Sequence, residues 1–439
     1  MENHNAYFPG FCDTEHRQLL SSIIEDSLSR QQTLNAKESK YWYPMSIPTY
    51  GSDEVINVLD SLLRMETTMG RKVRDFESRF ASMVGAKHAI MVNSGSSADL
   101  LACFACVMPG CEKLQAGDEI LIPALTWPTH IWSAIMAGLT VKTIDVDPST
   151  LNTTADIIEN AIGPKTKALF LVHLLGNPCD MDSIMAICNK HQLILLEDCC
   201  ESLCARYDGK HVGTFGLMGA FSFFFSHHLV TMEGGMVVTN DDQTADCLRI
   251  LRAHGWGREM QSKVPTKSGR DPRFQFINWG FNVRPTELQG AFGQIQLGRQ
   301  REFAASRNDK FRNMQSFLSV VPELSLPEWH PKAQPCWMFL PITVSRHSKF
   351  TKQQLIDFLE SKGVETRPVV VGDMKRQPAA DHFQFLRNSN TPGTEFVDDH
   401  CFLVGLHPRL TSNRCARSED HIERLQSLLR EYLSTKCEE

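Results

Sequence analysis

Leu193-Ile194-Leu195-Leu196-Glu197-Asp198 is a short apolar run that ends in two carboxylates. Two similar runs, Glu119-Ile120-Leu121-Ile122-Pro123 and Ala168-Leu169-Phe170-Leu171-Val172, precede it in the chain, and helical patterns lie between the runs. Runs of this length and spacing are typical of buried parallel strands in βαβ units. The sequence therefore predicts an α/β fold, and in such folds ligands bind beyond the carboxyl ends of the strands.

The bulk properties of the chain exclude several classes of partner. Its 439 residues are 42% hydrophobic, which is enough for a large core and two or three domains. The formal net charge of -6 leaves no excess of Lys and Arg for a phosphate backbone, so we expect no nucleic-acid partner. No stretch reaches 18 uninterrupted apolar residues, so we expect no membrane-spanning helix. The 14 cysteines are irregularly spaced and no apolar targeting segment is recognised, which favours a cytoplasmic protein without disulfides.

The pattern along the chain predicts three parts. Residues 1–40 form an N-terminal helical extension, residues 41–300 a large domain, and residues 301–439 a smaller C-terminal α/β domain. In the extension, Glu15 to Gln32 is amphipathic, and docking on the rest of the chain is favoured over binding to a partner. The C-terminal part contains two expected helices, Arg301–Phe317 and Lys352–Lys362, and two expected strands, Met338–Val344 and Val364–Val371. The polar segment Lys263–Arg273 is predicted to be a mobile flap.

Two segments of the large domain fit the binding of a planar, phosphorylated ligand. In Asn93-Ser94-Gly95-Ser96-Ser97, small residues begin a helical pattern, where free backbone N–H groups hold a phosphate; a plain turn with a Ser N-cap is the alternative. Asp198 at a strand end is able to keep a pyridine nitrogen protonated, or simply to cap a helix. Trp127 follows another strand and is placed either to stack on a ring or to fill the core.

The paired histidines of Ser226-His227-His228 stand just before Thr231-Met232-Glu233-Gly234-Gly235. Because no metal-ligand spacing such as His-x3-His is present, acid–base work is favoured over zinc binding, and we expect no metal. A lysine amine forms a Schiff base with an aldehyde, and an imidazole does not. A histidine at such a place therefore changes the reaction itself.

Taken in order, these motifs resemble the DegT/DnrJ/EryC1/StrS family of pyridoxal-phosphate enzymes that modify nucleotide sugars. The resemblance runs from Tyr43 to Leu429, and its motifs are Ser94-Gly95-Ser96, Thr126-Trp127, Glu197-Asp198, Phe221-Ser222-Phe223, Glu233-Gly234-Gly235 and Gly280-Phe281-Asn282-Val283-Arg284. It implies the aspartate aminotransferase (type I) fold, with a mostly parallel central sheet in the large domain and a smaller C-terminal α/β domain. Most members carry a lysine where this chain has His227, six positions before Glu233.

The resemblance also implies roles for individual residues. The cofactor, pyridoxal 5'-phosphate or its pyridoxamine form, is expected to contact Gly95, Ser96, Trp127, Asp198, Glu201, Ser222 and Asn282. The last of these would reach in from a second subunit, so a homodimer with shared active sites is expected. Candidates for contact with the sugar nucleotide are His254, Arg258 and Arg284.

His227 is the expected catalytic base. With histidine in place of lysine, the chain looks most like the 3-dehydratase branch of the family. That branch uses L-glutamate as amino donor and removes the C3 hydroxyl of a nucleotide-linked 4-keto-6-deoxyhexose, here expected to be GDP-linked. A nucleotide-sugar aminotransferase and a catalytically silent sugar-nucleotide-binding relative are the alternatives. His228 is expected to pack rather than to react.

A second branch of the family combines the cofactor with an iron–sulfur cluster, which needs several cysteine thiolates close together. Gly257–Lys263, where that branch places them, contains no cysteine, and Cys199, Cys200 and Cys204 adjoin the expected ring-binding Asp198. We therefore expect no iron–sulfur reductase partner.

Overall fold

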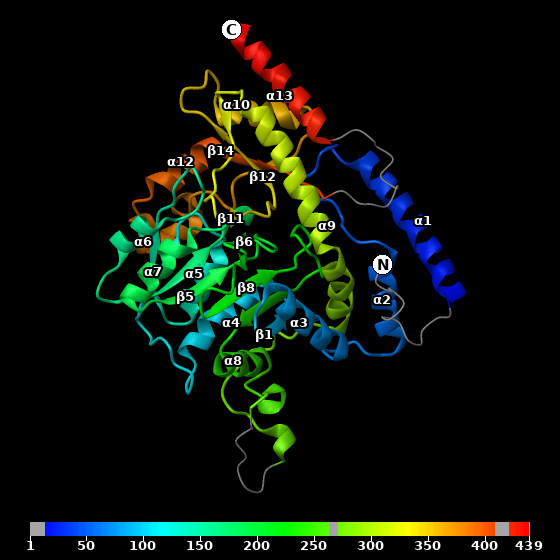
Figure 1. Cartoon of the computed structure of the whole chain (residues 1–439), viewed down its shortest axis with the longest axis vertical. Coiled ribbons are helices and arrows are strands. Elements are labelled where there is room, and N and C mark those ends of the chain that lie inside the picture. The colour runs from blue at the N-terminus through cyan, green and yellow to red at the C-terminus, as the bar shows by residue number, and fades with distance from the viewer. Residues whose placement is uncertain (1–13, 263–270, 409–420, 439) are drawn as a thin grey trace.

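A seven-stranded sheet lies at the centre of the computed structural model, which describes residues 14–262, 271–408 and 421–438 (Figure 1). Its strand order is β1-β9-β8-β5-β4-β2-β3. The bounds are β1 His88–Val92, β9 Gly235–Thr239, β8 Met218–Ser222, β5 Ile194–Asp198, β4 Thr166–Val172, β2 Glu119–Pro123 and β3 Thr140–Ile144. Only β9 pairs antiparallel with its neighbours, β1 and β8. The expected mostly parallel sheet is confirmed, and the three runs that predicted it are β2, β4 and β5.

Helices cover both faces of this sheet. They are α3 Arg71–Val84, α4 Gly95–Val107, α5 Pro128–Met136, α6 Ala155–Ala161, α7 Met181–His191 and α8 Asp242–Arg252, while α2 Ser52–Leu63 packs on α9 Glu287–Leu318. Successive strand residues point to opposite faces, so Leu196 joins one buried cluster with α4 and α5 while Leu195 joins another with α7. Burial on both faces explains why the strands read as unbroken apolar runs.

A second sheet, β10-β12-β14-β13, forms the smaller α/β part. Its strands are β10 Leu324–Ser325, β12 Leu340–Val344, β13 Thr366–Arg367 and β14 Cys401–Val404, and its helices include α10 Lys352–Ser361, α11 Gln384–Arg387, α12 Pro392–His400 and α13 His421–Glu438. β13 is much shorter than the expected Val364–Val371, because Pro368 lacks an N–H and Val370 has a φ of 52°. A small third sheet joins β6 Arg206–Tyr207, β7 Lys210–His211 and β11 Ala333–Gln334.

The longest helix, α9 Glu287–Leu318, connects the two parts and begins 14 residues before the expected Arg301. Its first half contains glycines, which weaken a helical pattern in sequence. A Cβ on Gly290 would lie 2.6 Å from the Val73 nitrogen, and one on Gly293 would lie 2.8 Å from the Phe76 ring. These glycines therefore allow α9 to pack closely on α3. The helix runs through the expected boundary at residue 300, and the division into domains stays a prediction.

The N-terminal extension contains α1 Thr14–Glu38, which docks on α2. Arg17 pairs with Asp53 at 3.3 Å, and Ser21 and Ser52 lie 2.8 Å apart between their hydroxyl oxygens. Part of the apolar stripe stays in solvent, because Leu19 is 59% exposed. The predicted helix exists, and the contacts that join it to α2 include an ion pair and a hydrogen bond.

Cys111 and Cys247 form a disulfide, which corrects the expectation that the chain has none. The bond links the segment after α4 to α8 across 136 residues of sequence, and a separation of this size gives no signal in an irregular cysteine pattern. Nine other cysteines of the described residues are free.

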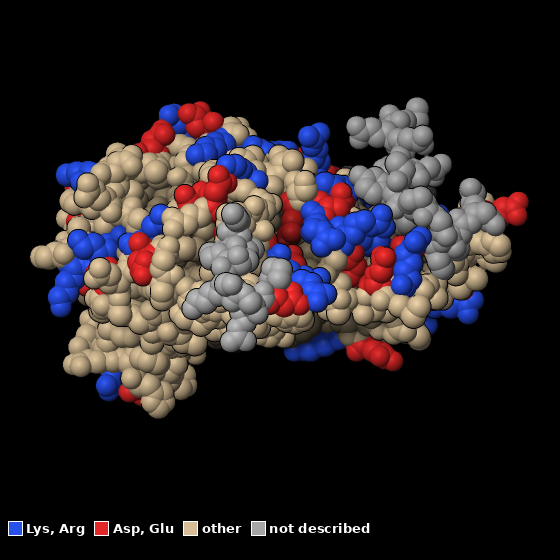
Figure 2. All heavy atoms as spheres, turned by 90° about the horizontal axis from the view of Figure 1, so that it is seen from below, with Lys and Arg blue, Asp and Glu red and all other residues tan. Residues whose placement is uncertain are grey.

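The surface shown in Figure 2 carries basic and acidic side chains side by side rather than one continuous basic area. The expected absence of a nucleic-acid partner stays a prediction. Among the helices of the described residues, none combines the length and the apolar character needed to cross a membrane.

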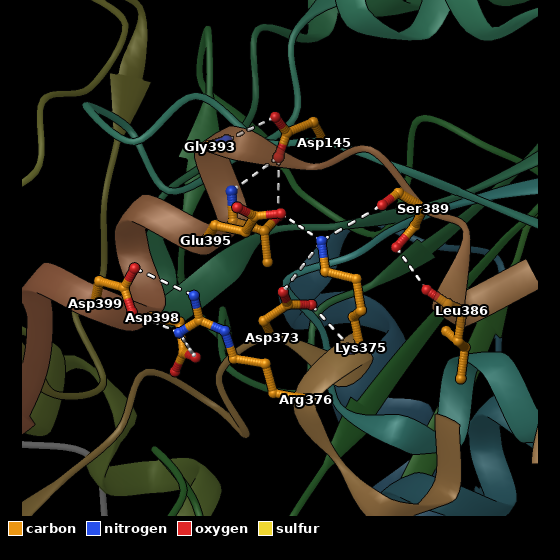
Figure 3. A network of polar contacts seen from close by, with 11 residues as sticks. Asp145, Asp373, Lys375, Arg376, Leu386, Ser389, Gly393, Glu395, Asp398 and Asp399 are labelled. Carbon is orange, nitrogen blue, oxygen red and sulfur yellow. Dashed lines mark hydrogen bonds and ion pairs between the residues drawn. The ribbon is translucent and has the colours of Figure 1, made fainter. Parts of the chain in front are cut away.

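A polar network fastens α12 to the large sheet (Figure 3). Asp145, which follows β3, accepts hydrogen bonds from the Gly393 N–H at 2.7 Å and the Thr394 N–H at 2.8 Å. A carboxylate at a helix N-terminus satisfies free N–H groups and the helix dipole. Lys375 and Arg376 extend the network to the acidic side chains of α12.

We expect Asp145→Ala to lower the free energy of unfolding by about 1–2 kcal/mol, because two backbone N–H groups of α12 lose their acceptor. Urea denaturation followed by circular dichroism measures the change. Asp309→Ala serves as control, since Asp309 and its partner Arg312 are both exposed, and this change is expected to stay within about 0.5 kcal/mol. Equal effects of the two substitutions would contradict the proposed role of Asp145.

Candidate active site

A cavity of about 400 Å³ opens beyond the carboxyl ends of the central strands. The neighbouring strands β4, β5 and β8 end at Val172, Asp198 and Ser222, and all three residues line the cavity. Of the residues expected to bind cofactor or to act as base, those in the lining are Gly95, Ser96, Trp127, Asp198, Glu201, Ser222 and His227. The opposite wall comes from the smaller α/β part and consists of Met338, Phe339, Arg367, Pro368, Val370 and Leu403.

The N-terminus of α4 meets the end of β8 at one side of the cavity. Ser94 caps α4 by accepting a hydrogen bond from the Ser97 N–H at 3.1 Å. A Cβ on Gly95 would lie 2.5 Å from the Cβ of Ser222, so only glycine permits this approach. Ser96 and Thr129 face each other with 3.0 Å between their hydroxyl oxygens. The N-cap and the anion site, which the sequence left as alternatives, are therefore compatible in the same turn.

Asp198 lies beside a buried imidazole that the sequence had not indicated. The Nε2 atom of His130, on α5, is 3.2 Å from Asp198 and 3.5 Å from Asp99, while its Nδ1 is 2.5 Å from the Thr126 hydroxyl. All three ionisable side chains are at most 4% exposed. The Cys200 N–H adds a hydrogen bond of 3.0 Å to Asp198.

The charges of this trio follow from their mutual distances. Burial opposes a charged His130, but Asp99 and Asp198 outweigh it and raise the pKa of His130 to about 9. Burial likewise opposes ionisation of Asp198, yet His130 lowers the pKa of Asp198 below its usual value. Burial raises the pKa of Asp99 well above its usual range, with the charge of Asp198 contributing. Neutral Asp99, cationic His130 and anionic Asp198 together leave a buried site without net charge.

Trp127 and Glu201 occupy other parts of the lining. Trp127 precedes Pro128, the first residue of α5, and its side chain is 54% exposed, which is unusual for an indole without a partner surface. The indole is therefore available to stack on a planar ligand. Glu201 accepts a hydrogen bond from the Leu175 N–H at 3.0 Å, and burial raises the pKa of Glu201 to about 7.

The two histidines of the loop between β8 and β9 differ in environment. His227 lines the cavity, its Nδ1 is buried without a hydrogen-bond partner, and its ring meets Phe224 edge to face. Burial, reinforced by His228, lowers the pKa of His227 to about 3, so the ring is neutral at neutral pH. His228 is buried, and its Nε2 lies 2.7 Å from the Cys336 carbonyl oxygen. These contacts favour packing for His228, as expected.

Helix α9 holds this loop in place. The Gln289 side chain donates to the Glu233 carbonyl oxygen at 2.5 Å, and the Gln296 side chain accepts from the Val230 N–H at 3.3 Å. Within the loop, the Thr231 hydroxyl donates to the Glu233 carbonyl oxygen at 2.8 Å. The loop on the C-terminal side of His227 is therefore held in place by these three hydrogen bonds.

Four residues with expected roles lie outside the cavity lining of this single chain. His254 and Arg258 are exposed, and the Arg258 guanidinium lies 5.2 Å from the centre of the Trp256 ring. Arg284 donates through Nε to the Asn282 side-chain oxygen at 3.0 Å. Their contacts with cofactor or substrate stay a prediction.

Cysteines near Asp198 take separate positions. Cys199 is buried among the side chains of α3 and β8, Cys200 lines the cavity, and the Cys204 thiol donates to Gln300 at 2.9 Å. The carboxylate oxygens of Asp99 and Asp198 and the sulfur of Cys200, which are possible metal ligands, lie within 4.8 Å of one another. Asp198, however, already forms an ion pair with His130. The expectation that no metal is bound stays a prediction.

The pattern of the DegT/DnrJ/EryC1/StrS aminotransferase family matches residues 48–422. The chain belongs to this family. It is 36% identical to a GDP-4-keto-6-deoxy-D-mannose 3-dehydratase from Escherichia coli, over 83% of this chain and 95% of the relative. It is 34% identical to a dTDP-4-dehydro-2,6-dideoxy-D-glucose 3-dehydratase from Saccharopolyspora spinosa, over 82% of this chain and 81% of the relative.

Solved structures agree with these relatives. A crystal structure of GDP-4-keto-6-deoxymannose-3-dehydratase with a trapped PLP-glutamate geminal diamine superposes with a TM-score of 0.82. It is 34% identical, and the match covers 88% of this chain and all of that one. Family membership and the aspartate aminotransferase fold, both predicted from the motifs, are confirmed.

We expect His130→Gln to lower the free energy of unfolding by roughly 3 kcal/mol at pH 6, because a buried carboxylate loses its counter-charge. The raised pKa of His130 stabilises the fold below the ordinary value of 6.5, and this stability is lost as the pH rises through about 9. The difference between native protein and variant is therefore expected to shrink from pH 6 to pH 9.5.

Urea denaturation at the two pH values measures this difference, and His347→Gln at an exposed histidine is the control. A deficit that stays the same at both pH values would contradict a cationic His130.

Proposed function

We propose that this protein is a pyridoxal-phosphate-dependent nucleotide-sugar 3-dehydratase that uses L-glutamate as amino donor. The observation that carries the proposal is His227, which stands in the cavity where most family members have lysine. Among the described residues that line the cavity, none is a lysine. An aminotransferase of this family would lack its anchoring amine here, so the 3-dehydratase is favoured over that alternative.

The residues present fit a phosphorylated pyridine cofactor. The start of α4 offers unpaired N–H groups at Gly95 and Ser96 beside the Ser222 hydroxyl, which suits a phosphate. Asp198 is held as a carboxylate by His130 and faces the cavity, which suits a protonated ring nitrogen, and Trp127 offers its face for stacking. When bound, pyridoxal phosphate supplies an aldehyde that takes up an amino group and a ring that withdraws electrons.

His227 is suited to accept a proton. Burial lowers the pKa of His227, so the ring is neutral at neutral pH and has a nitrogen lone pair that can take up a proton. The bonds of α9 to Glu233 and Val230 fix the loop that presents it. An imidazole in this position can carry a proton from one atom of a bound ligand to another. Unlike a lysine amine, it forms no Schiff base with the cofactor.

The sugar and nucleotide are assigned from relatives. Two of the similar proteins carry the name GDP-4-keto-6-deoxy-D-mannose 3-dehydratase, and the solved relative with a trapped PLP-glutamate geminal diamine supports glutamate as donor. We therefore propose GDP-4-keto-6-deoxy-D-mannose as the substrate. A cytoplasmic location is part of the proposal and is supported by the nine free cysteines of the described residues, which outnumber the two of the Cys111–Cys247 disulfide.

A homodimer with shared active sites is also proposed. Asn282 and Arg284 lie outside the cavity of their own chain, and the segment that carries them exposes large aromatic side chains. Phe274 is 62% exposed, Phe276 63% and Trp279 40%. Exposed aromatic clusters of this kind are typical of protein interfaces. We therefore propose that a second copy of the chain buries this segment.

We expect His227→Asn to reduce turnover at least about 100-fold, because asparagine cannot accept the proton, while the cofactor absorbance stays that of the native protein. His227→Lys is expected to let borohydride fix the cofactor covalently, which the native protein does not allow. His347→Asn is the matched control and is expected to leave turnover unchanged. Native turnover by His227→Asn would refute the proposed base.

Mixing two impaired variants tests the shared site. In a dimer of one His227→Asn chain and one Asn282→Ala chain, one of the two sites combines native His227 with native Asn282 of the partner subunit. Random exchange is expected to restore about one quarter of native turnover. Light scattering checks that the protein is dimeric, and mixtures no more active than their components would show that Asn282 does not act across the interface.

A further inference from the structure

Two free cysteines, Cys204 and Cys336, lie together beside the loop between β8 and β9. The strands β6 and β11 pair antiparallel with Arg206 opposite Gln334, and two further residues along this register bring Cys204 opposite Cys336. The two side chains are close enough to form a hydrogen bond. Opposed residues of an antiparallel pair have Cα atoms about 4.5–5.5 Å apart, within the range of about 4.4–6.8 Å that a disulfide spans.

The backbone ladder of the two strands ends before it reaches the cysteines. The Cys204 N–H donates to His211 Nε2 at 3.0 Å, and Cys204 has a φ of 71°. The Cys336 N–H donates to the Gly176 carbonyl oxygen at 2.9 Å. Each N–H has an acceptor outside the pair, so the two sulfurs can approach without breaking a ladder bond between the strands.

The chemical surroundings make this pair more reactive than an isolated buried thiol. Hydrogen bonding with Cys204, together with the nearby Arg307, holds the pKa of Cys336 well below its usual range although burial opposes this. Hydrogen bonding with Cys336 and burial raise the pKa of Cys204, so the two sulfurs share one proton at neutral pH. Burial instead raises the pKa of Cys103. Because the thiolate is the nucleophile, oxidation favours the pair.

Solvent reaches the pair through Cys204. Its side chain is partly exposed, whereas Cys336 is 1% exposed. Among the free cysteines of the described residues, only Cys200 is exposed to a similar degree, and it lies in the cavity lining. A small oxidant such as hydrogen peroxide can therefore meet the Cys204 sulfur while Cys336 waits behind it.

We propose that Cys204 and Cys336 form a site of reversible oxidation, at which hydrogen peroxide converts the two thiols into a disulfide. Cys204 passes its proton to Cys336 and attacks one peroxide oxygen; the O–O bond breaks, and Cys204 becomes a sulfenic acid. The Cys336 sulfur then attacks the Cys204 sulfur, and the S–S bond forms. The two sulfurs lose two electrons, and the peroxide takes up these electrons and both thiol protons to leave as two molecules of water.

The disulfide acts on the loop of His227 through Cys336. The carbonyl oxygen of Cys336 lies 2.7 Å from Nε2 of His228, the residue that follows His227. Bond formation draws the two sulfurs to about 2.05 Å, which moves this carbonyl and its partner His228. Cys204 at the same time gives up its proton and with it the hydrogen bond of 2.9 Å to Gln300 of α9. We therefore expect oxidation to slow turnover, a consequence that rests on the proposed function, whereas disulfide formation does not.

Peptide mapping measures the disulfide without reference to activity. The cofactor-loaded protein is treated with hydrogen peroxide, its remaining thiols are alkylated, and the digested peptides are identified by mass spectrometry. The native protein is expected to yield a Cys204–Cys336 linkage that dithiothreitol removes. Cys204→Ser and Cys336→Ser are expected to yield no linked peptide at this site. Cys188→Ser, a change at a buried cysteine of α7, is the control and is expected to behave as the native protein.

Turnover is measured on the same samples before and after peroxide. Peroxide is expected to lower turnover of the native protein and of Cys188→Ser about 10-fold, because a displaced catalytic side chain is costly, and dithiothreitol is expected to restore it. Cys204→Ser and Cys336→Ser are expected to keep their turnover within about twofold after peroxide, since neither can form the bond.

A folded native protein that yields no linkage, or one between other cysteines, would overturn the site, and this result needs no variant. A Cys204–Cys336 linkage with unchanged turnover would overturn the effect on the His227 loop. Equal losses of turnover in the native protein and in both pair variants would do the same. A reduced native protein that is inactive from the start would refute the 3-dehydratase, while the peptide map would still decide the site.

Discussion

The buried pair of Asp198 and His130 is the contact on which the cavity depends. A carboxylate at the end of a central strand, enclosed by apolar side chains, stays ionised only beside an opposite charge. His130 supplies that charge at 3.2 Å, and neutral Asp99 completes the trio. His130 belongs to α5, and Trp127 stands at the start of the same helix.

The loop between β8 and β9 presents His227 to the cavity. β8, β9 and the Gly234-Gly235 turn form the frame that places this residue there. An imidazole there is desolvated, and burial keeps the ring neutral at neutral pH. The two strands and the turn therefore determine where residue 227 lies. Its side chain determines whether a Schiff base can form there.

Short-range patterns predicted the parallel strands, the Gly95 and Ser96 turn and the candidate base, because each rests on local backbone or residue chemistry. Features that depend on distant contacts escaped prediction. The role of His130 is evident only in the folded chain, where α5 brings it next to Asp198. The glycines of α9 allow close packing on α3, which no local sequence pattern indicates. Arg367 reaches the cavity through a two-residue edge strand. The Cys111–Cys247 bond likewise appears only once α4 and α8 are adjacent.

Helix α9 touches both walls of the cavity. Gln289 and Gln296 hold the His227 loop, while Arg307 donates to the carbonyl oxygen of Met338 on the opposite wall at 2.5 Å. Its 32 residues make a rod about 48 Å long that joins the two α/β parts in Figure 1. Because one rigid helix contacts both walls, it fixes the distance between His227 and the opposite wall. A bulkier sugar would therefore need smaller side chains in the cavity lining and not a movement of the two α/β parts.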